Sequence, residues 1–510
     1  MKDKKILLAV ILTSVFLIIT GITYAYFSLV VSGNDVAETI NVSTTKIELI
    51  YTDGNEIKVD SIEPKWTTTK TITVENTGNE EAYYALGWQK LYNEIQKEEL
   101  VIRSTCTSSG VTGGTCSNTD NVVIPQTSEV TAEANKVIYP YKENVEILPG
   151  EKHTYTVTIE FINYEDKAQN YNQGKRFYGV LGAAESTKKL TISDMCQDTT
   201  LASCLKDNYE LAGLTEIDQT ATGNQNYATS EYRYQGKTPN NYITFNGETG
   251  VWRIIGVFEV ETPNADGTYT KENKVKIVRD RIGNVSWNYK GSSNYKNDWA
   301  TATLMTMLNS GPYYNKTSGY TQLACSTGYD TTTSETAICN YESNGLTDNA
   351  KNQISNTKWY LGNVVWNSGY GTTKEIYTQE RSTSVHSGNK QTWNGKVALI
   401  YPSDYMYASS ACYNDDTKKG YDINGSSPFN TDYRSETCKS TNWLFDTSNY
   451  FWAVSPSSRN SGIALGVSSS GFLASLTDDS SFGLRQSVYL DSSVKYIGGD
   501  GTAKKAFEIE

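Results

Sequence analysis

The sequence predicts a multidomain protein in which an antiparallel β-sandwich is followed by an α+β domain. Residues 28–186 alternate apolar and polar side chains between turn residues, which is typical of paired strands. Residues 232–510 combine strand patterns with short helical ones and long Ser- and Asn-rich loops, which favours an α+β domain. The chain has 510 residues, 38% of them hydrophobic and 20% charged, enough for about two to four folded domains.

Charge and histidine content exclude several classes of function. Lys and Arg number 45 against 57 Asp and Glu, so the net charge is −12, and the chain contains no basic block. A nucleic-acid partner is therefore not expected, since such proteins need a basic surface. His153 and His386 are the only histidines, which disfavours histidine-based catalysis and multi-histidine metal sites. The sequence predicts no cofactor, no metal and no catalytic residue.

Residues 1–27 have the pattern of an export signal. Lys2, Lys4 and Lys5 precede an uncharged, largely apolar run over 6–27. This run reaches the ~20 residues that cross a bilayer, but Thr23-Tyr24-Ala25 is a suitable cleavage site. We favour a cleaved signal peptide, with a retained N-terminal membrane anchor as the alternative. Either outcome places the rest of the chain outside the cytoplasmic membrane, in an extracellular or cell-surface location.

The cysteines agree with an oxidising compartment. They form four neighbouring couples without CxxC spacing, which disfavours thiolate metal sites and thioredoxin-type chemistry. We expect disulfides between neighbours; eight free thiols in a reducing compartment are the alternative. Residues eight apart on a continuous helix lie about 12 Å apart, so the second couple requires a chain break near 198–200. The candidate couples are Cys106 and Cys116, Cys196 and Cys204, Cys325 and Cys339, and Cys412 and Cys438.

About seven strand patterns support the predicted sandwich over 28–186. The clearest covers 154–161, where Tyr155, Val157, Ile159 and Phe161 share one face and polar residues the other. Further strands are predicted at 36–42, 46–51, 71–74, 81–88, 137–141 and 177–183.

Two motifs in this region carry a family resemblance. Gly-Ile-Thr-Tyr-Ala-Tyr-Phe-Ser stands at 21–28, and Thr-Ile-Thr-Val-Glu-Asn-Thr-Gly at 71–78 is followed by Ala-Tyr-Tyr at 82–84. The region thereby resembles the camelysin/TasA-type family of exported surface and biofilm-matrix proteins, although Leu29 replaces the family's usual aspartate. The resemblance implies a jelly-roll-like sandwich and, in some members, assembly into fibres. The proteolytic role claimed for such proteins has no supporting motif here.

Residues 187–231 are polar and predict a linker and entry segment with a short disulfide-closed helix at 193–205. The α+β domain is predicted to begin with a hairpin whose arms cover 241–245 and 251–257. Asp298 is a candidate N-cap of a helix over 299–308 that ends before Gly311-Pro312. Further strands are predicted at 274–279, 395–401, 450–454, 462–467, 472–475 and 484–490.

Five segments of this domain, including Trp-Arg-Ile-Ile-Gly at 252–256, carry a second resemblance; the others are 299–309, 396–404, 451–457 and 484–490. They resemble the C-type-lectin-like superfamily, which occurs in surface proteins of gut Firmicutes and includes the formylglycine-generating, sulfatase-modifying branch. The resemblance implies a C-type-lectin-like fold over 232–510 but no single activity, because this fold carries unrelated functions. Related receptor-binding proteins would place ligand contacts within 455–482.

The loop at 455–460 is the candidate recognition surface, because its side chains form a dense hydrogen-bonding set; an ordinary surface turn is the alternative. The acidic pair at 478–479 is expected in a solvated loop, since Ca²⁺ needs about six to eight oxygen ligands. Calcium-dependent sugar binding is not predicted. Trp366 and Trp393, in polar surroundings, are stacking candidates or lids over a small core. The candidate ligand-binding residues are Ser455, Ser457, Ser458, Arg459, Asn460, Asp478, Asp479 and Phe482.

Three hypotheses of function follow. The first is a non-enzymatic, exported surface protein whose lectin-like module, carried on the β-sandwich, binds a protein or glycan on a cell surface. The second is a matrix or fibre subunit that polymerises by strand addition. The third, an enzyme of the formylglycine-generating type, is disfavoured because the final strands contain no cysteine beyond Cys438.

Overall fold

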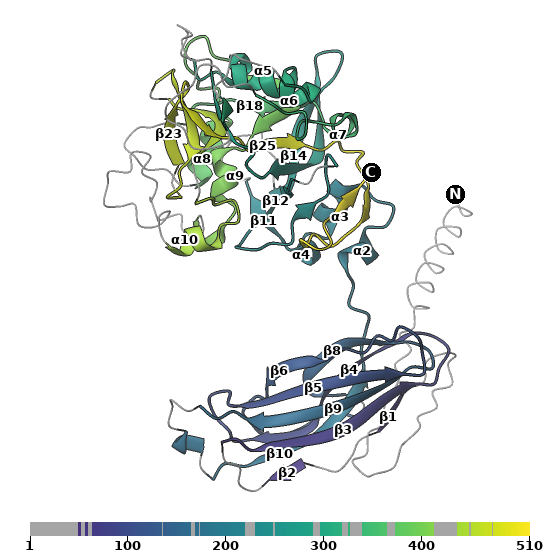
Figure 1. Cartoon of the computed structure of the whole chain (residues 1–510). Helices are drawn as coiled ribbons and strands as arrows, with labels where there is room; N and C mark the ends of the chain where they lie inside the picture. The colour runs from purple at the N-terminus through teal and green to yellow at the C-terminus, as the bar shows by residue number, and fades with distance from the viewer. Residues whose placement is uncertain are drawn as a thin grey trace, which may run out of the picture. The chain divides into compact units, whose positions relative to one another are not determined.

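The computed structural model divides the chain into two compact units, residues 1–189 and 190–510. Each is built mainly from antiparallel β-sheet (Figure 1). The described residues are 49–52, 57–59, 64–134, 136–164, 169–172, 174–219, 230–247, 250–288, 296–318, 325–326, 339–364, 373–412, 436–447, 450–458, 460–471 and 473–510. The predicted signal or anchor at 1–27 and the strand at 36–42 lie outside these ranges. Among the described helices, none is long and apolar enough to cross a membrane.

The described residues of the first unit form two five-stranded sheets. One contains β1 (Leu49–Thr52), β3 (Thr67–Asn76), β9 (Lys152–Phe161), β5 (Leu100–Ser109) and β6 (Thr119–Val123) in that order. The other contains β2 (Ile57–Val59), β10 (Phe177–Glu185), β4 (Ala82–Asn93), β7 (Thr127–Thr131) and, also paired with β4, β8 (Ile138–Ile147).

Both sheets of the first unit contribute to one core. Ile72 and Ile159 of the first sheet pack in the same buried cluster as Tyr84 and Leu181 of the second. The predicted alternation along β9 is confirmed, because its apolar face is buried. A period of two turns those side chains to one side of the sheet, so the unit is a sandwich with its core between the sheets.

The second unit contains two larger sheets, whose strands all pair antiparallel except for β21 with β24. In the seven-stranded sheet the order is β11 (Leu214–Asp218), β12 (Ser230–Tyr234), β14 (Trp252–Pro263), β15 (Tyr269–Arg279), β25 (Gln486–Tyr489) and β20 (Val397–Leu399), with β13 (Tyr242–Ile243) beside β14. In the six-stranded sheet it is β17 (Cys325–Ser326), β16 (Asn284–Ser286), β24 (Ser481–Gly483), β21 (Phe451–Pro456), β22 (Ile463–Val467) and β23 (Leu473–Thr477). Two short pairs join β18 (Thr357–Tyr360) to β19 (Thr392–Gly395) and β26 (Tyr496–Gly498) to β27 (Glu508–Ile509).

Among the described residues the helices are short, and all lie in the second unit apart from a 3₁₀ turn at Asn170–Asn172. They are α2 (Ile192–Met195), α3 (Leu201–Asp207), α4 (Tyr209–Ala212), α5 (Thr303–Asn309), α6 (Pro312–Asn315), α7 (Asp348–Gln353), α8 (Thr373–Glu380), α9 (Pro402–Met406) and α10 (Glu436–Thr441), with 3₁₀ turns at Trp299–Thr301 and Ser410–Cys412.

The segment predicted as a linker, 187–231, differs from that expectation. Its described residues form α2 to α4 and β11, and Leu201, Leu205 and Leu214 lie in the main core of the second unit. The polar composition is that of helix caps and turns: Thr200 accepts a hydrogen bond from the backbone N–H of Ser203 at the start of α3. The polar residues of this segment are therefore helix caps and turn residues. Their composition resembles that of a linker, so the sequence did not distinguish the two.

The helix predicted over 299–308 is interrupted. Asp298 Oδ1 accepts the N–H of Ala300 at 3.1 Å, as an N-cap does, but the capped element is a 3₁₀ turn. Ala302 is extended, and α5 begins only at Thr303. Pro312, predicted to stop the helix, is the first residue of α6, a position where proline's missing N–H costs nothing.

Each of the eight cysteines pairs with its predicted neighbour: Cys106–Cys116, Cys196–Cys204, Cys325–Cys339 and Cys412–Cys438. The expected break is present, since Asp198 has φ 58° between α2 and α3. These four disulfides fit an oxidising environment.

Candidate binding pocket

One face of the seven-stranded sheet carries buried charges at alternate positions. Glu231 and Arg233 on β12 and Lys274 and Lys276 on β15 are each at most 3% exposed. A period of two places the members of each pair on the same side of the sheet. The register aligns Arg233 with Gly256 and Gly256 with Lys276 across the three strands. The two cations therefore lie on the same side with only a glycine of β14 between them.

Gly256 is needed for this arrangement. A Cβ at this position would come within 2.1 Å of the carbonyl oxygen of Tyr232 on β12. A β-bulge in β14 immediately precedes it, between Ile254 and Gly256. The glycine thus allows the two strands to approach closely where the charged side chains meet.

Helices α8 and α9, which pack against each other, bring the partners of these charges. In α9, Asp404 is 1% exposed and its Oδ2 accepts the backbone N–H of Tyr401 at 2.8 Å, so the capping interaction fixes the carboxylate. Arg233 lies 2.9 Å from Asp404 Oδ1, and Lys276 Nζ lies 2.6 Å from Oδ2. Asp404 therefore joins both cations of the sheet.

Two further carboxylates complete the network. Glu231 accepts two hydrogen bonds from Arg233, at 2.7 and 2.9 Å, and one from the Tyr377 hydroxyl at 2.5 Å. Glu380 accepts the N–H and the hydroxyl of Ser403, at 2.7 and 2.5 Å, and lies 3.1 Å from Arg381. Three cations and three carboxylates thus compensate one another, as buried charges require.

Burial shifts the pKa of these groups in opposite directions. It raises the pKa of Glu380 to about 7, against the opposing effect of Arg381, and lowers the pKa of Lys276 to about 8, against that of Asp404. For Asp404, burial acts to raise the pKa, but Lys276 and Arg233 outweigh it and hold the value at about 2.

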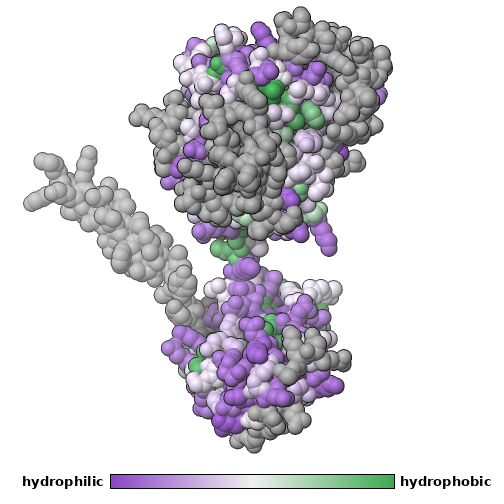
Figure 2. Space-filling model, turned by 90° about the vertical axis from the view of Figure 1, so that its left-hand side faces the viewer, coloured by the Kyte–Doolittle hydropathy of each residue, from purple (hydrophilic) through white to green (hydrophobic). Residues whose placement is uncertain are grey.

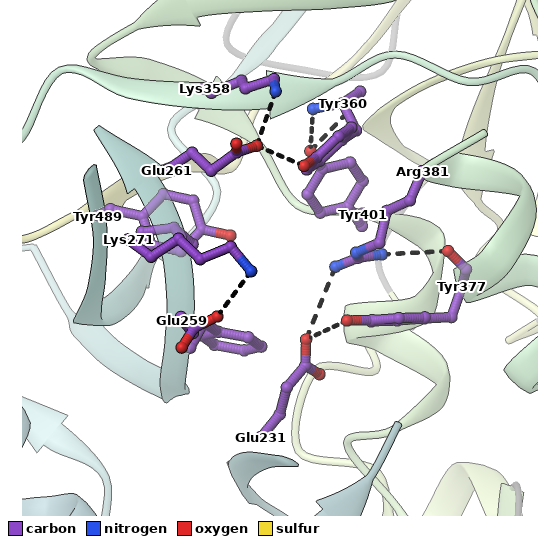
Figure 3. Close-up of a pocket in the computed structure, with 12 residues that line it drawn as sticks. Glu231, Glu259, Glu261, Lys271, Lys358, Tyr360, Tyr377, Arg381, Tyr401 and Tyr489 are labelled. Atoms are coloured by element: carbon purple, nitrogen blue, oxygen red, sulfur yellow. Dashed lines mark hydrogen bonds and ion pairs between the residues drawn. The ribbon is translucent and has the colours of Figure 1, made fainter. Parts of the chain in front are cut away.

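A pocket adjoins this network (Figure 3). One side is formed by Glu259 and Glu261 on β14 and Lys271 on β15, and the opposite side by Tyr377 of α8 and the following Arg381. The space between these residues, including open solvent at the mouth, is about 480 Å³. The complete lining is Glu231, Phe258, Glu259, Val260, Glu261, Lys271, Lys358, Tyr360, Tyr377, Arg381, Tyr401 and Tyr489.

The mouth of the pocket is built from paired groups. Glu261 lies 2.7 Å from Lys358 and accepts the Tyr360 hydroxyl at 2.6 Å, while Glu259 lies 3.3 Å from Lys271. The lining contains three acidic and three basic side chains, so it has no excess charge. It therefore offers donors, acceptors and aromatic rings to a polar ligand without selecting for ionic charge.

The predicted recognition loop is largely internal. Ser455 and Ser457 are at most 1% exposed, and the Ser457 carbonyl accepts hydrogen bonds from Asn297 Nδ2 at 3.0 Å and contacts His386 Nε2 at 2.8 Å. Asn460 is exposed, although its carbonyl also accepts from Asn297. Ser458 is half-buried and Arg459 lies outside the described residues.

The acidic pair at 478–479 is not a solvated loop, which corrects that expectation. Asp478 is 1% exposed and accepts a hydrogen bond from Asn288 Nδ2 at 2.9 Å, and burial raises its pKa. Asp479 is half-buried, and the half-buried Phe482 packs edge-on against Trp452 with ring centroids 5.0 Å apart. Asp478 and Phe482 therefore both contact neighbours within the fold.

Trp393, one of the two aromatic candidates, contributes to packing. Trp393 is half-buried, and its ring centroid lies 6.1 Å from that of Trp299, edge-on. Trp366 lies outside the described residues. In the first unit, Cys106, Cys116 and His153 offer ligand atoms within 4.8 Å of one another, but both sulfur atoms belong to a disulfide and so provide no thiolate.

Sequence reasoning missed the pocket. The alternation of Lys274 and Lys276 with apolar neighbours is ordinarily that of a half-exposed strand, and the acidic partners Glu231 and Asp404 are distant in sequence. No local signal connects them. Comparison with known proteins adds no further guide, since no protein-family model and no curated protein matches the chain.

Proposed function

We propose that the chain is an exported, non-enzymatic cell-surface protein whose second unit binds a protein or glycan in the pocket next to the charge network. The pocket's balanced lining carries this proposal. Paired acids and bases such as Glu261 and Lys358 present both acceptors and donors at its mouth. The groups beneath them are fixed by ion pairs, so the pocket is formed before a ligand arrives, which reduces the entropic cost of binding.

The export part of the proposal is supported by the disulfides. Each of the four disulfides closes a loop within its own unit, and such bonds persist in oxidising compartments. We propose that residues 1–27 direct export, either as a cleaved signal or as a membrane anchor. The sequence pattern described above is its support.

We further propose that the sandwich is of the jelly-roll-like, camelysin/TasA type and that the second unit is C-type-lectin-like. In support of the latter, the start and end of the second unit meet: Thr200 forms a bridge with Lys495, and Ile243 with Phe507. A formylglycine-generating activity is not proposed, because that chemistry needs a thiol and each of the eight cysteines is in a disulfide.

The test compares the pocket with the loop that the sequence favoured. The full chain, the double variant Glu259→Gln/Lys271→Met and the variant Asn460→Ala are applied to a glycan array and to intact bacterial and epithelial cells. We expect the pocket variant to lose most binding and Asn460→Ala to retain it. Retained binding by the pocket variant, with loss in Asn460→Ala, would transfer the function to the loop.

A matched control accompanies this test. Lys90 and Glu129 form a surface ion pair on the first unit, with N and O 2.8 Å apart. The double variant Lys90→Met/Glu129→Gln removes the same two charges from the chain without touching the pocket. It is expected to bind as the unchanged protein does, and equal loss in both double variants would show a general charge effect.

A further inference from the structure

Lys276 is enclosed by aromatic rings. Its Nζ lies 4.4 Å from the ring centroid of Tyr401, 5.0 Å from that of Trp359 and 5.2 Å from that of Tyr489. The side chain is 0% exposed. Such rings stabilise the ammonium form less than water would, and they also exclude water. The amine therefore lies in a site without solvent access.

The single carboxylate that touches this amine is unusually well held among the described residues. Lys276 Nζ lies 2.6 Å from Asp404 Oδ2, which also accepts the Tyr401 N–H, while Arg233 donates to Oδ1 at 2.9 Å. An amine and a carboxyl group fixed at this distance have an effective concentration far above any in solution, on the order of 10⁵–10⁸ M. Condensation, which water prevents between free ions, becomes accessible under these conditions.

We propose that Lys276 and Asp404 form an intramolecular isopeptide bond. The amide would replace one buried ammonium and one buried carboxylate by a neutral group, and so remove the desolvation penalty of both. Arg233 and Arg381 would remain opposite Glu231 and Glu380, so the network stays balanced.

The reaction needs no co-reactant. One proton passes from Nζ to Oδ2, and the neutral amine attacks Cγ; the negative charge that develops on Oδ1 faces the Arg233 guanidinium. A second proton from the nitrogen follows to Oδ2, the Cγ–Oδ2 bond breaks, and one water molecule leaves. The new Nζ–Cγ amide keeps one hydrogen. The lowered pKa of Lys276, about 8, assists by bringing the neutral amine within reach at neutral pH.

Lys274 provides a matched control on the same strand and face. It is also buried, but it donates to Ser355 Oγ at 2.6 Å and pairs with Glu272, whose side chain is 30% exposed. That carboxylate remains accessible to water, and no second cation is placed on it by the described contacts. Lys274 is therefore expected to keep its free amine.

The experiment is a peptide map of the full chain, unfolded in guanidinium, reduced and digested with trypsin. We expect peptides 275–279 and 397–418 to be recovered as one branched species, lighter than their sum by one water, with no cleavage after Lys276. Fragmentation should locate the link between Lys276 and Asp404. Separate recovery of the two peptides, with cleavage after Lys276, would overturn the proposal.

Variants sharpen this result. Lys276→Arg keeps the positive charge but removes the nucleophilic amine, and Asp404→Ala removes the acceptor; neither should yield the branched species. Lys274→Arg should yield it in full. Because the unchanged protein is decisive by itself, failure of a core variant to fold does not affect the outcome.

Discussion

The two units bury polar groups by different means. In the first unit, Glu151 is 0% exposed and accepts hydrogen bonds from Ser108 Oγ at 2.6 Å and from the backbone N–H groups of Thr115 and Leu148 at 2.8 and 2.9 Å. His153 Nε2 lies 2.7 Å away. In the second unit, Asp404 is buried against two full cations, Arg233 and Lys276.

The difference shows two routes to a buried carboxylate. Glu151 is satisfied by donors, most of them uncharged, and burial lowers the pKa of its neighbour His153, which favours the neutral imidazole. Asp404 depends on two cations from two separate strands, Arg233 of β12 and Lys276 of β15. Hydrogen bonds offset the cost of burying a carboxylate through several weak partners. Ion pairs offset it through a few strong ones. The second network should therefore suffer more from a single substitution.

The largest expected effect is that of Arg233→Met. It preserves side-chain volume but leaves the buried carboxylate of Glu231 without its paired cation, so the second unit should lose about 3–5 kcal/mol of unfolding free energy. Calorimetry of the full chain, with one transition assigned to each unit, measures this. The transition of the first unit should not move. A loss below about 1 kcal/mol would mean that the stability of the network does not depend mainly on Arg233.

A smaller effect is expected for Glu151→Gln in the first unit. The amide keeps one acceptor but turns an N–H₂ group either toward the donors of Ser108 and Thr115 or toward that of Leu148, which should cost about 1–3 kcal/mol. Denaturant unfolding checks the value. If this variant destabilises its unit as strongly as Arg233→Met does the other, the contrast between the two networks disappears.

The pH dependence of the two units should have opposite signs. Glu380 has an ordinary pKa of 4.5 and a folded value of about 7, so between these values the folded state binds a proton that the unfolded state has lost, and stability of the second unit falls as pH rises. The slope is at most about 1.4 kcal/mol per pH unit. His153 has an ordinary pKa of 6.5 that burial lowers, so the unfolded first unit binds the extra proton and stability rises toward pH 6.5.

Melting temperatures of both transitions between about pH 5 and 6.5 test this sign difference. Glu380→Gln should flatten the dependence of the second unit, and His153→Gln that of the first. Burial also raises the pKa of Asp298 and Asp478, the same direction as for Glu380. If the melting temperatures of both units changed with pH in the same direction, the assignment of these dependences to Glu380 and His153 would be wrong.

The smallest effect on stability is expected at the mouth of the pocket. Glu259 and Lys271 are 38% and 48% exposed, so Glu259→Gln should change unfolding free energy by about 0.5 kcal/mol or less. Binding, by contrast, should weaken. A large loss of stability here would mean that the mouth belongs to the buried network rather than to a ligand surface.

Local patterns in the sequence predicted much of the fold. The period of two in β9, the β13–β14 pairing, the neighbouring disulfides and the chain break beside Cys196 were all accessible from spacing. In the polar segment at 187–231 the short disulfide-closed helix was expected, but the contribution of its described residues to the core was not, because caps and linkers have similar composition. The serines of the 455–460 loop were misjudged because a polar side chain can be buried wherever partners such as Asn297 are supplied by a distant segment.

The sequence by itself determined many of the strands, which cysteines are close enough to pair and that the chain contains no basic block, because these depend on neighbours along the chain. Only the tertiary structure decided that Glu231, Lys276, Arg381 and Asp404 share one buried network beneath a pocket. Charge on a strand has the same sequence pattern whether it faces water or a counter-charge. The choice between these environments is made by long-range packing, which brings the compensating group from more than a hundred residues away.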